Sequence, residues 1–342
     1  MALPLSPPLE PMLAKAQVEI PRSDGWLYEP KWDGFRALIF RDGESVRIQS
    51  RNALPLERYF PELLDPLREA LPERAVVDGE IVIGTPNGLD FDRLQMRLHP
   101  AASRVKMLSE QTPASVVLFD VLAIDDDDLR RTPLAERRRL LVHGVRTSKA
   151  VGITPQTASP DEAGQWFERY EGAGLDGVVA KKTEGDYRHG ERQWVKVKHL
   201  RTADCVVGGF RPLAKGVGIG SLLLGLYGDD GTLHFVGHTS GFSAAERREI
   251  LARLEPMKDE DSFGAGRTPG GPSRWNRGAE AAWTSVRPEL VCEVSFDHLQ
   301  GPRFRHAARF LRWRADKAPR DCTYEQLAPP EKFALEDIIL AP

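Results

Sequence analysis

The most informative part of the sequence is Glu29-Pro30-Lys31-Trp32-Asp33-Gly34-Phe35-Arg36, which has the form E-x-K-x-D-G-x-R. A lysine lies at its centre, with one carboxylate two residues before it and another two residues after it. A free lysine amine has an unperturbed pKa of about 10.4 and is a weak nucleophile at neutral pH, but burial, a nearby cation or a metal lowers that pKa. An acid beside the lysine can bind a divalent metal, and glycine lets the backbone approach a phosphate or a sugar. The stretch therefore has the parts of a covalent phosphoryl-type catalyst.

The same residues also fit a simpler interpretation. The Asp33-Gly34 pair is typical of a tight turn, which would join a strand over residues 26–32 to a strand over 35–40 in a β-hairpin. Short motifs often match by chance, so this stretch alone leaves both interpretations open. The order of further motifs along the chain has to separate them.

Length and composition set limits on the answer. With 342 residues the chain predicts two domains, because single cores seldom grow beyond roughly 250–300 residues. There is no long apolar run and no basic, apolar leader at the start, so we expect a cytoplasmic protein with no membrane span. The three cysteines are far apart, which argues against a disulfide framework or a zinc site. A hard cation bound by carboxylates remains open.

The charge is unevenly distributed. The formal net charge is −3, from 47 basic and 50 acidic residues, which is unlike a strongly basic nucleic-acid binder. Residues 301–320 nevertheless carry seven basic side chains and only one acidic side chain, Asp316. Such a stretch predicts a phosphate-rich partner, and a solvated basic face is the alternative.

The pattern of apolar residues predicts a mixed first part and a strand-rich second part. In the first part we expect strands over residues 75–83, 116–122, 175–182 and 193–198, and helices over 61–70, 91–98, after an N-cap at Thr132, and after a capping box at Ser159. In the second part we expect short strands over 206–210, 221–227, 234–238, 291–296 and 309–313, with one helix capped by Ser243. This second set fits a small barrel of OB-fold size.

Charged residues interrupt the buried strands of the first part. Asp78 and Glu80 lie within a strand, where a charge is costly unless it is paired or functional. Lys196 and Lys198 alternate with Val195 and Val197, so one face of that strand should present two cations.

Taken in order, these motifs resemble the covalent nucleotidyltransferases, and among them the ATP-dependent DNA ligases of the bacterial LigC and LigD type. The resemblance covers nearly the whole chain. The residues that carry it are Glu29-x-Lys31-x-Asp33-Gly34-x-Arg36, Ser50-Arg51, Asp78-Gly79-Glu80, Phe119-Asp120, Asp176-Gly177 through Lys181, Trp194-x-Lys196-x-Lys198, and Arg309 through Lys317.

The resemblance implies a fold and a reaction. The fold class is α+β, with an ATP-grasp-like nucleotidyltransferase (adenylation) domain over residues 1–200 and an OB-fold β-barrel over 201–342. Lys31 would attack the α-phosphate of ATP, the AMP would pass to the 5′-phosphate of a nick, and the 3′-hydroxyl would then displace AMP. The implied partner is nicked duplex DNA, the implied context is DNA repair, and the implied state is a monomer that associates with the nucleoid when bound to DNA.

The resemblance also implies roles for residues around the nucleotide. Lys196 and Lys198 would hold the α-phosphate and, with a bound cation, lower the pKa of Lys31. Mg²⁺ or Mn²⁺ would bind Glu80 and Asp176, with Asp33 beside the nucleophile among the catalytic residues. Asp176 departs from the family, which usually has Glu there, and the shorter side chain puts direct metal ligation in doubt.

The remaining roles concern the base, the sugar and the second domain. Phe119 would stack on adenine, and Glu29 would accept a hydrogen bond from its amino group. Arg36 and Arg51 would lie near the ribose and the 5′-phosphate of the nick. The second domain would turn about a hinge in residues 198–204 and close over ATP, while residues 264–278 would help to grip DNA. The closing residues would be Arg312, Arg314, Asp316 and Lys317.

Three alternatives remain at this point. An mRNA-capping guanylyltransferase shares the lysine motif, and preference for GTP over ATP would identify it. An RNA ligase would fail to seal a nick made only of DNA. A non-catalytic OB-type nucleic-acid binder would form no covalent AMP adduct.

Overall fold

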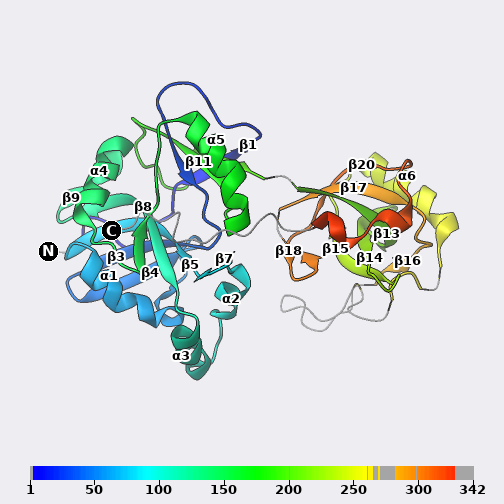
Figure 1. Ribbon diagram of the computed structural model, residues 1–342, viewed down its shortest axis with the longest axis horizontal. Helices are drawn as coiled ribbons and strands as arrows, with labels where there is room; N and C mark the ends of the chain where they lie inside the picture. The colour runs from blue at the N-terminus through cyan, green and yellow to red at the C-terminus, as the bar shows by residue number, and fades with distance from the viewer. Residues whose placement is uncertain are drawn as a thin grey trace. The chain divides into compact units, whose positions relative to one another are not determined.

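The chain forms two compact units in a computed structural model (Figure 1). The structure describes residues 3–199, 201–259, 261–264, 269, 282–297 and 299–327. The first unit contains the described residues up to His199, and the second contains those from Arg201 to Leu327. The expected DNA-gripping loop over 264–278 lies outside the described residues, except for Gly264 and Pro269.

The first unit is built on two sheets. One has four strands in the order β1 (Leu13–Gln17), β12 (Arg192–Lys198), β11 (Gly177–Lys182) and β2 (Trp26–Pro30). The other runs β10 (Val151–Ile153), β8 (Ser115–Ile124), β5 (Arg74–Val82), β3 (Phe35–Asp42) and β4 (Ser45–Ser50), with β9 (Asp127–Asp128) beside β8. A small hairpin joins β6 (Gly84–Thr85) to β7 (Gly88–Leu89).

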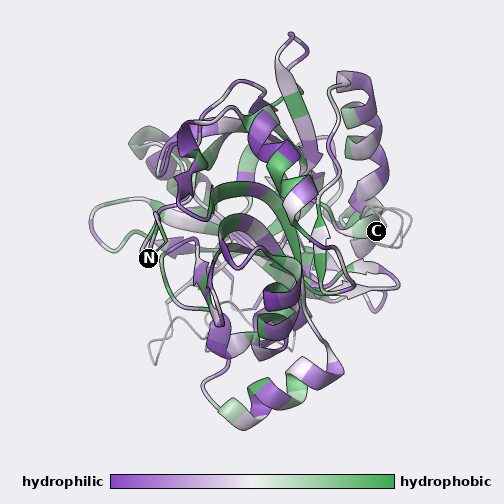
Figure 2. Ribbon diagram, turned by 90° about the vertical axis from the view of Figure 1, so that its left-hand side faces the viewer, coloured by the Kyte–Doolittle hydropathy of each residue, from purple (hydrophilic) through white to green (hydrophobic). Residues whose placement is uncertain are grey.

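The first unit also has helices outside these sheets. They are α1 (Leu64–Ala70), α2 (Phe91–Met96), α3 (Ala102–Gln111), α4 (Leu134–Gly144) and α5 (Pro160–Arg169). Leu67 of α1 and Leu141 of α4 pack on one face of the six-stranded sheet, and Ala163 of α5 packs against Val195 on the four-stranded sheet. The inner faces of the two sheets meet through a cluster that includes Phe119 and Trp194. In Figure 2 the central strands are accordingly coloured mainly as hydrophobic, while the outer helices alternate.

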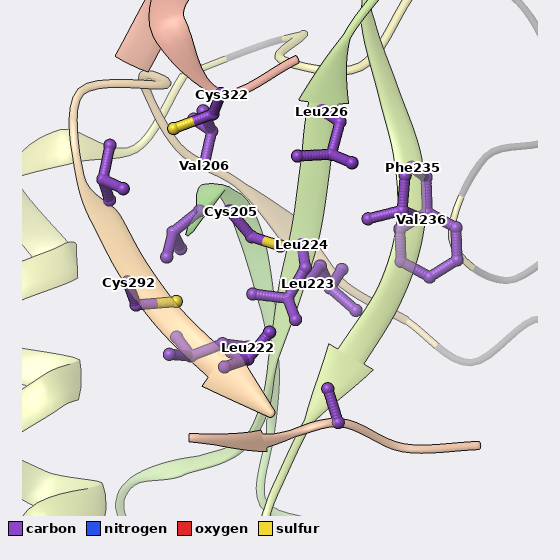
Figure 3. Close-up of a cluster of buried hydrophobic side chains, with 14 of the residues drawn as sticks. Cys205, Val206, Leu222, Leu223, Leu224, Leu226, Phe235, Val236, Cys292 and Cys322 are labelled. Carbon is purple, nitrogen blue, oxygen red and sulfur yellow. The ribbon is translucent and has the colours of Figure 1, made fainter. Parts of the chain in front are cut away.

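The second unit is a small barrel with a core of its own. Its sheet has the order β15 (Leu233–Thr239), β14 (Ile219–Tyr227), β13 (Arg201–Pro212), β17 (Val291–Phe296) and β20 (Arg309–Trp313), with β16 (Thr284–Ser285) beside β13. A parallel bridge from Thr239 to Ala308 joins the two edges. Helix α6 (Ala244–Leu254) and the hairpin of β18 (Leu299–Gln300) and β19 (Arg303–Phe304) complete the unit. Figure 3 shows its interior, where Cys205, Cys292 and Cys322 lie among aliphatic side chains as free thiols.

Much of the expected secondary structure is confirmed. The α+β class, the five strands of the barrel and the alternation of Lys196 and Lys198 against buried Val195 and Val197 agree with the structure. The Ser243 capping box is also present. None of the described helices is long and apolar enough to cross a membrane.

The structure differs from the sequence analysis at four places. β2 and β3 belong to different sheets, so Asp33-Gly34 forms no hairpin between them. Thr132 does not cap α4, because Pro133 occupies the N-cap and, within the described residues, no side chain caps this helix. Helix α3 was not expected, because only Val105 and Leu108 supply an apolar face to a polar segment. Residues 201–204 of the expected hinge are paired in β13, which leaves two residues between β12 and β13.

Two Asp-Gly pairs pack closely against neighbouring backbone, one where the chain crosses between the sheets and one at the start of β11. A Cβ on Gly34 would lie 2.1 Å from the carbonyl oxygen of Ile81, and a Cβ on Gly177 would lie 2.0 Å from that of Val197. Gly177 also has φ +134°, which side chains rarely adopt. Both positions therefore require glycine.

We expect Gly177→Ala to lower the free energy of unfolding by about 2–4 kcal/mol, because the new methyl group meets backbone and the φ is strained. Gly164→Ala is the matched control. It lies in α5, where among the described residues no atom comes within 4 Å of the added Cβ, so it should gain up to about 1 kcal/mol. Urea unfolding of both variants tests this, and equal stabilities for the two would contradict it.

Candidate active site

Residues 31–34 carry the chain from one sheet to the other. β2 ends at Pro30 in the four-stranded sheet, and β3 begins at Phe35 in the six-stranded sheet. Trp32 anchors the crossing, since its ring is buried and its Nε1 donates to Thr154 Oγ1 at 2.8 Å. The crossing places the lysine and both of its neighbouring acids where the inner faces of the sheets meet.

Backbone contacts fix the lysine at its position. The Lys31 N–H donates to the Gly177 carbonyl at 2.8 Å, and the Asp176 N–H donates to the Lys31 carbonyl at 2.9 Å. On the other side, the Gly34 N–H donates to Glu80 Oε1 at 3.2 Å. The two Asp-Gly pairs and Glu80 are thereby brought together from segments far apart in sequence.

Two ammonium groups share one carboxylate oxygen. The Nζ atoms of Lys31 and Lys198 each lie 2.6 Å from Asp176 Oδ2. The Asp176 side chain is buried, while those of Lys31 and Lys198 remain partly exposed. A buried carboxylate thus holds the candidate nucleophile and a candidate phosphate-binding lysine in one place.

The pKa of Lys31 is raised, and this corrects an expectation. Burial lowers the pKa, but the charge and hydrogen bond of Asp176, followed by the charges of Glu80 and Asp33, outweigh it. We expected Lys196, Lys198 and a bound cation together to lower the pKa, whereas the protein's own charges act in the opposite direction, because the three acids lie around this amine. Lys31 is therefore held as an ammonium ion, and any reaction of its amine as a nucleophile would require the loss of a proton first.

Lys196 lies in an excess of positive charge. Burial lowers its pKa, and so do the charges of Lys198, Lys31 and Arg51, against which Asp176 acts alone. Arg51 follows β4 on an exposed turn. These four cations come from three separate segments, and they form a place where an anion such as a phosphate would be stabilised.

Glu80, in contrast to Lys196, carries negative charge that its surroundings do not fully compensate. Burial raises its pKa to about 7, the charges of Arg36 and Lys31 oppose this rise, and those of Asp33 and Asp78 add to it. Its negative charge is therefore not fully compensated by the protein. A bound divalent cation would supply the missing positive charge.

The acids by themselves do not make a complete metal site. Among the described residues, no group of three or more His, Cys, Asp or Glu side chains could hold a metal ion. Mg²⁺ usually binds through one or two carboxylates together with waters and substrate phosphates. Glu80 and Asp176 fit that kind of site, whereas a cage formed by protein ligands alone does not.

Glu29 is buried and held by two partners. Lys181 Nζ lies 2.6 Å from Glu29 Oε2, and Gln156 Nε2 donates to Glu29 Oε1 at 2.8 Å. Lys181 ends one of the motifs found in the sequence, but the sequence analysis predicted no role for it. Gln156 has no signal in the sequence, because it reaches the site only through the position of the segment after β10.

Arg36 and Phe119 form part of the support behind the site. Arg36 binds both oxygens of buried Asp78, through Nε at 2.5 Å and Nη2 at 2.6 Å, and Asp78 also accepts from the Tyr187 hydroxyl. The guanidinium lies 4.7 Å from the centre of the Phe119 ring. A contact of Arg36 with ribose or phosphate, and stacking of Phe119 on a base, remain predictions.

The remaining site residues lie in the second unit. Arg312 Nε lies 2.6 Å from Glu293 Oε2. Arg314 binds Asp204 and Asp316, at 2.9 Å and 2.8 Å. The stretch over 301–320 is therefore less basic in the fold than in the sequence, because acids from other strands pair with its arginines. Lys317 follows on the turn after β20.

Comparisons with known proteins agree with this arrangement. Residues 11–198 match the model of the "ATP dependent DNA ligase domain", and residues 215–317 match that of the "ATP dependent DNA ligase C terminal region". The chain is 50% identical to DNA ligase C1 of Mycolicibacterium smegmatis and 49% identical to DNA ligase C of Mycobacterium tuberculosis, in each case over 99% of both chains.

A solved structure described as "DNA binding with a minimal scaffold: Structure-function analysis of Lig E DNA ligases" has a similar fold. It is 18% identical to this chain, has a TM-score of 0.53, and the match covers 89% of this chain and 99% of the other. At this identity the likeness concerns the fold alone.

The raised pKa of Glu80 predicts a pH-dependent gain in stability for Glu80→Gln. The folded protein holds the Glu80 proton more tightly than the unfolded chain, so wild type loses stability as the pH rises from 4.5 through about 7. Glutamine removes this loss and can still accept from Gly34. We expect a gain of about 1–2 kcal/mol at pH 8 and little change at pH 4.5, measured by urea unfolding with a chelator present.

Glu136→Gln is the control for this experiment. Glu136 is partly exposed, and its pKa is lowered by a hydrogen bond from Arg139, so its replacement should bring no gain at pH 8. A gain for Glu80→Gln that is equal at both pH values would show that its charge is not the cause.

Proposed function

The chain belongs to the ATP-dependent DNA ligases of the bacterial LigC and LigD type, and from this premise we propose that it seals nicks in duplex DNA through an AMP group carried on Lys31. A nick with a 5′-phosphate and a 3′-hydroxyl is the substrate. The observation that supports this most directly is the amine of Lys31, which is held on Asp176 beside Lys198 in a cluster of cations and acids.

The first step forms a phosphoramidate. Lys31 Nζ, once deprotonated to solvent, attacks the α-phosphorus of ATP. The Nζ–P bond forms as the bond from the α-phosphorus to the α–β bridging oxygen breaks, and pyrophosphate leaves. The 5′-phosphate of the nick then takes AMP from the lysine, and the 3′-hydroxyl attacks the activated phosphate and displaces AMP.

Positively charged side chains form the proposed binding site of the α-phosphate. Lys196, Lys198 and Arg51 bring an excess of positive charge to one side of Lys31. Negative charge that develops on the α-phosphate during the attack is stabilised there, because the groups are positioned before the reaction begins. When the phosphate arrives, Lys198 has a second partner besides Asp176, and Lys31 is released more easily.

Glu80 and Asp176 would hold a divalent cation, Mg²⁺ or Mn²⁺. The raised pKa of Glu80 supports this, because it marks a buried carboxylate whose charge Arg36 and Lys31 do not fully compensate. The metal supplies neutralisation of the phosphate charge. Asp33 adds negative charge beside the lysine, and a carboxylate engaged with a metal attracts the Lys31 ammonium less strongly.

Glu29 gives the site its preference for adenine. Lys181 and Gln156 fix the direction of its carboxylate, which accepts a hydrogen bond from the amino group of the base. Guanine has an oxygen at that place, so a carboxylate would repel it. Phe119 offers an aromatic face for the base.

The two units have separate tasks. Residues 1–200 form the adenylation domain and residues 201–342 the OB-fold domain, which turns about the residues between β12 and β13. Arg312, Arg314, Asp316 and Lys317 act on the pyrophosphate end of ATP, while Arg36 supports the base and sugar. The protein acts in the cytoplasm as a monomer on nicked DNA during repair.

Transfer of label from ATP tests the central step. With α-³²P-ATP and Mg²⁺, wild type should form an acid-labile adduct that nicked DNA discharges, and Lys31→Ala should form none. Lys15→Ala, at an exposed position of β1, is the matched control and should label as wild type does. Label that survives the loss of Lys31 would refute the proposal.

The same assay separates the alternatives. We expect α-³²P-GTP to label the protein at least about 100-fold less efficiently than ATP, because a buried carboxylate faces the base. Efficient labelling by GTP would indicate a guanylyltransferase. Sealing of a nick in RNA but not in DNA would indicate an RNA ligase.

A further inference from the structure

Two acids on adjacent strands of the second unit face each other. Asp204 of β13 lies opposite Glu293 of β17, and Glu293 lies opposite Arg312 of β20. Side chains that are directly opposite in an antiparallel pair share one face of the sheet, and like charges in these positions are destabilising. The pair therefore needs positive partners.

The arginines of the ligase motif are those partners. Arg314 Nη1 donates to Asp204 Oδ1 at 2.9 Å and to Oδ2 at 3.0 Å, and Arg312 Nε donates to Glu293 Oε2 at 2.6 Å. The side chains of Asp204 and Arg314 are 16% and 18% exposed, while that of Arg312 is 62% exposed. The pair of Asp204 with Arg314 is therefore the better shielded and the stronger of the two.

All three guanidinium nitrogens of Arg314 donate hydrogen bonds to carboxylates. Its Nε and Nη2 bind Asp316, at 2.9 Å and 2.8 Å, while Nη1 binds Asp204. The hydrogen bond with Asp316, followed by the charges of Asp204, Asp316 and Glu293, raises the pKa of Arg314. A guanidinium used in this way cannot bind a phosphate bidentately until one carboxylate leaves.

Backbone contacts make the pairing a fixed feature of this unit. The Arg314 N–H donates to the Val291 carbonyl at 2.9 Å. Gln326 binds the backbone of Asp204 twice, through Oε1 to its N–H at 2.7 Å and through Nε2 to its carbonyl at 3.0 Å. These contacts fix the backbones of Asp204 and Arg314, while their side chains can still exchange partners.

We propose that Asp204 and Glu293 are positioning residues that compete with the triphosphate of ATP for Arg314 and Arg312. This rests on the proposed function, in which these arginines act on the pyrophosphate end of ATP. As ATP is taken up, Arg314 exchanges Asp204 for phosphate oxygens. After the Lys31 Nζ–P bond has formed and the bond to the α–β bridging oxygen has broken, the acids take the arginines back, and this favours the departure of pyrophosphate.

The competition has a distinct kinetic signature. It opposes binding of both ATP and pyrophosphate, since either anion must displace the same carboxylates. The last step, in which the 3′-hydroxyl displaces AMP from an adenylated 5′-phosphate, involves no triphosphate. Loss of the competition should therefore change lysine adenylation and its reversal, but not the sealing of a nick that already carries AMP.

Asp204→Asn is the principal test, because it removes the charge and keeps the shape. We expect its KM for ATP in lysyl-AMP formation, and its KM for pyrophosphate in the reverse reaction, to be about three- to tenfold lower than in wild type. Sealing of a pre-adenylated nick should be unchanged. Glu293→Gln should act in the same direction but more weakly, because Arg312 is more exposed.

Glu289→Gln is the matched control, since Glu289 pairs with Arg287 at 2.8 Å on the surface of the same unit, outside this set, and should leave both KM values unchanged. An unchanged or higher KM for ATP in both acid variants would overturn the inference. So would a parallel loss of adenylation and sealing together with a lower melting temperature, which would indicate a purely structural role. A wild-type protein that forms no lysyl-AMP would instead overturn the proposed function.

Discussion

The ion pairs of Asp176 with Lys31 and Lys198 are the interaction on which the site depends. One buried oxygen holds two ammonium groups at 2.6 Å, and the backbone of the same aspartate pairs with that of Lys31. Two cations on one oxygen leave the group with an excess of positive charge. The arrangement therefore keeps Lys31, the proposed nucleophile, in position, and an arriving phosphate or metal would rearrange it.

Near this group, one side chain has uncompensated negative charge around it and another has uncompensated positive charge. Burial raises the pKa of Glu80 to about 7 in spite of the charges of Arg36 and Lys31. Burial, together with the charges of Lys198, Lys31 and Arg51, lowers the pKa of Lys196 in spite of Asp176. Each imbalance costs the fold stability. A metal and a phosphate that bind together would correct both at once, so part of the stability given up by the fold returns as binding free energy for the nucleotide.

The sequence predicted what depends on local pattern. The strands of the barrel and the two-sided character of β12 follow from alternation of apolar residues, and they agree with the structure. The alternative of a hairpin at Asp33-Gly34 is excluded by the structure. The same residues suit both a turn and a crossing between sheets, and only the pairing of β2 with β11 distinguishes the two. The effect of the protein's own charges on the pKa of Lys31 was missed for a similar reason, because Asp176, Glu80 and Asp33 meet only in the fold.

The basic stretch near the end of the chain shows the same limit for charge. Counting residues over 301–320 gives a strong positive charge, but charge acts through distance and not through position in the sequence. Asp204 lies about a hundred residues earlier and still neutralises Arg314, because β13 and β20 both flank β17. A motif therefore names the arginines that can bind phosphate, whereas their partners in the barrel determine what a phosphate must displace in order to bind them.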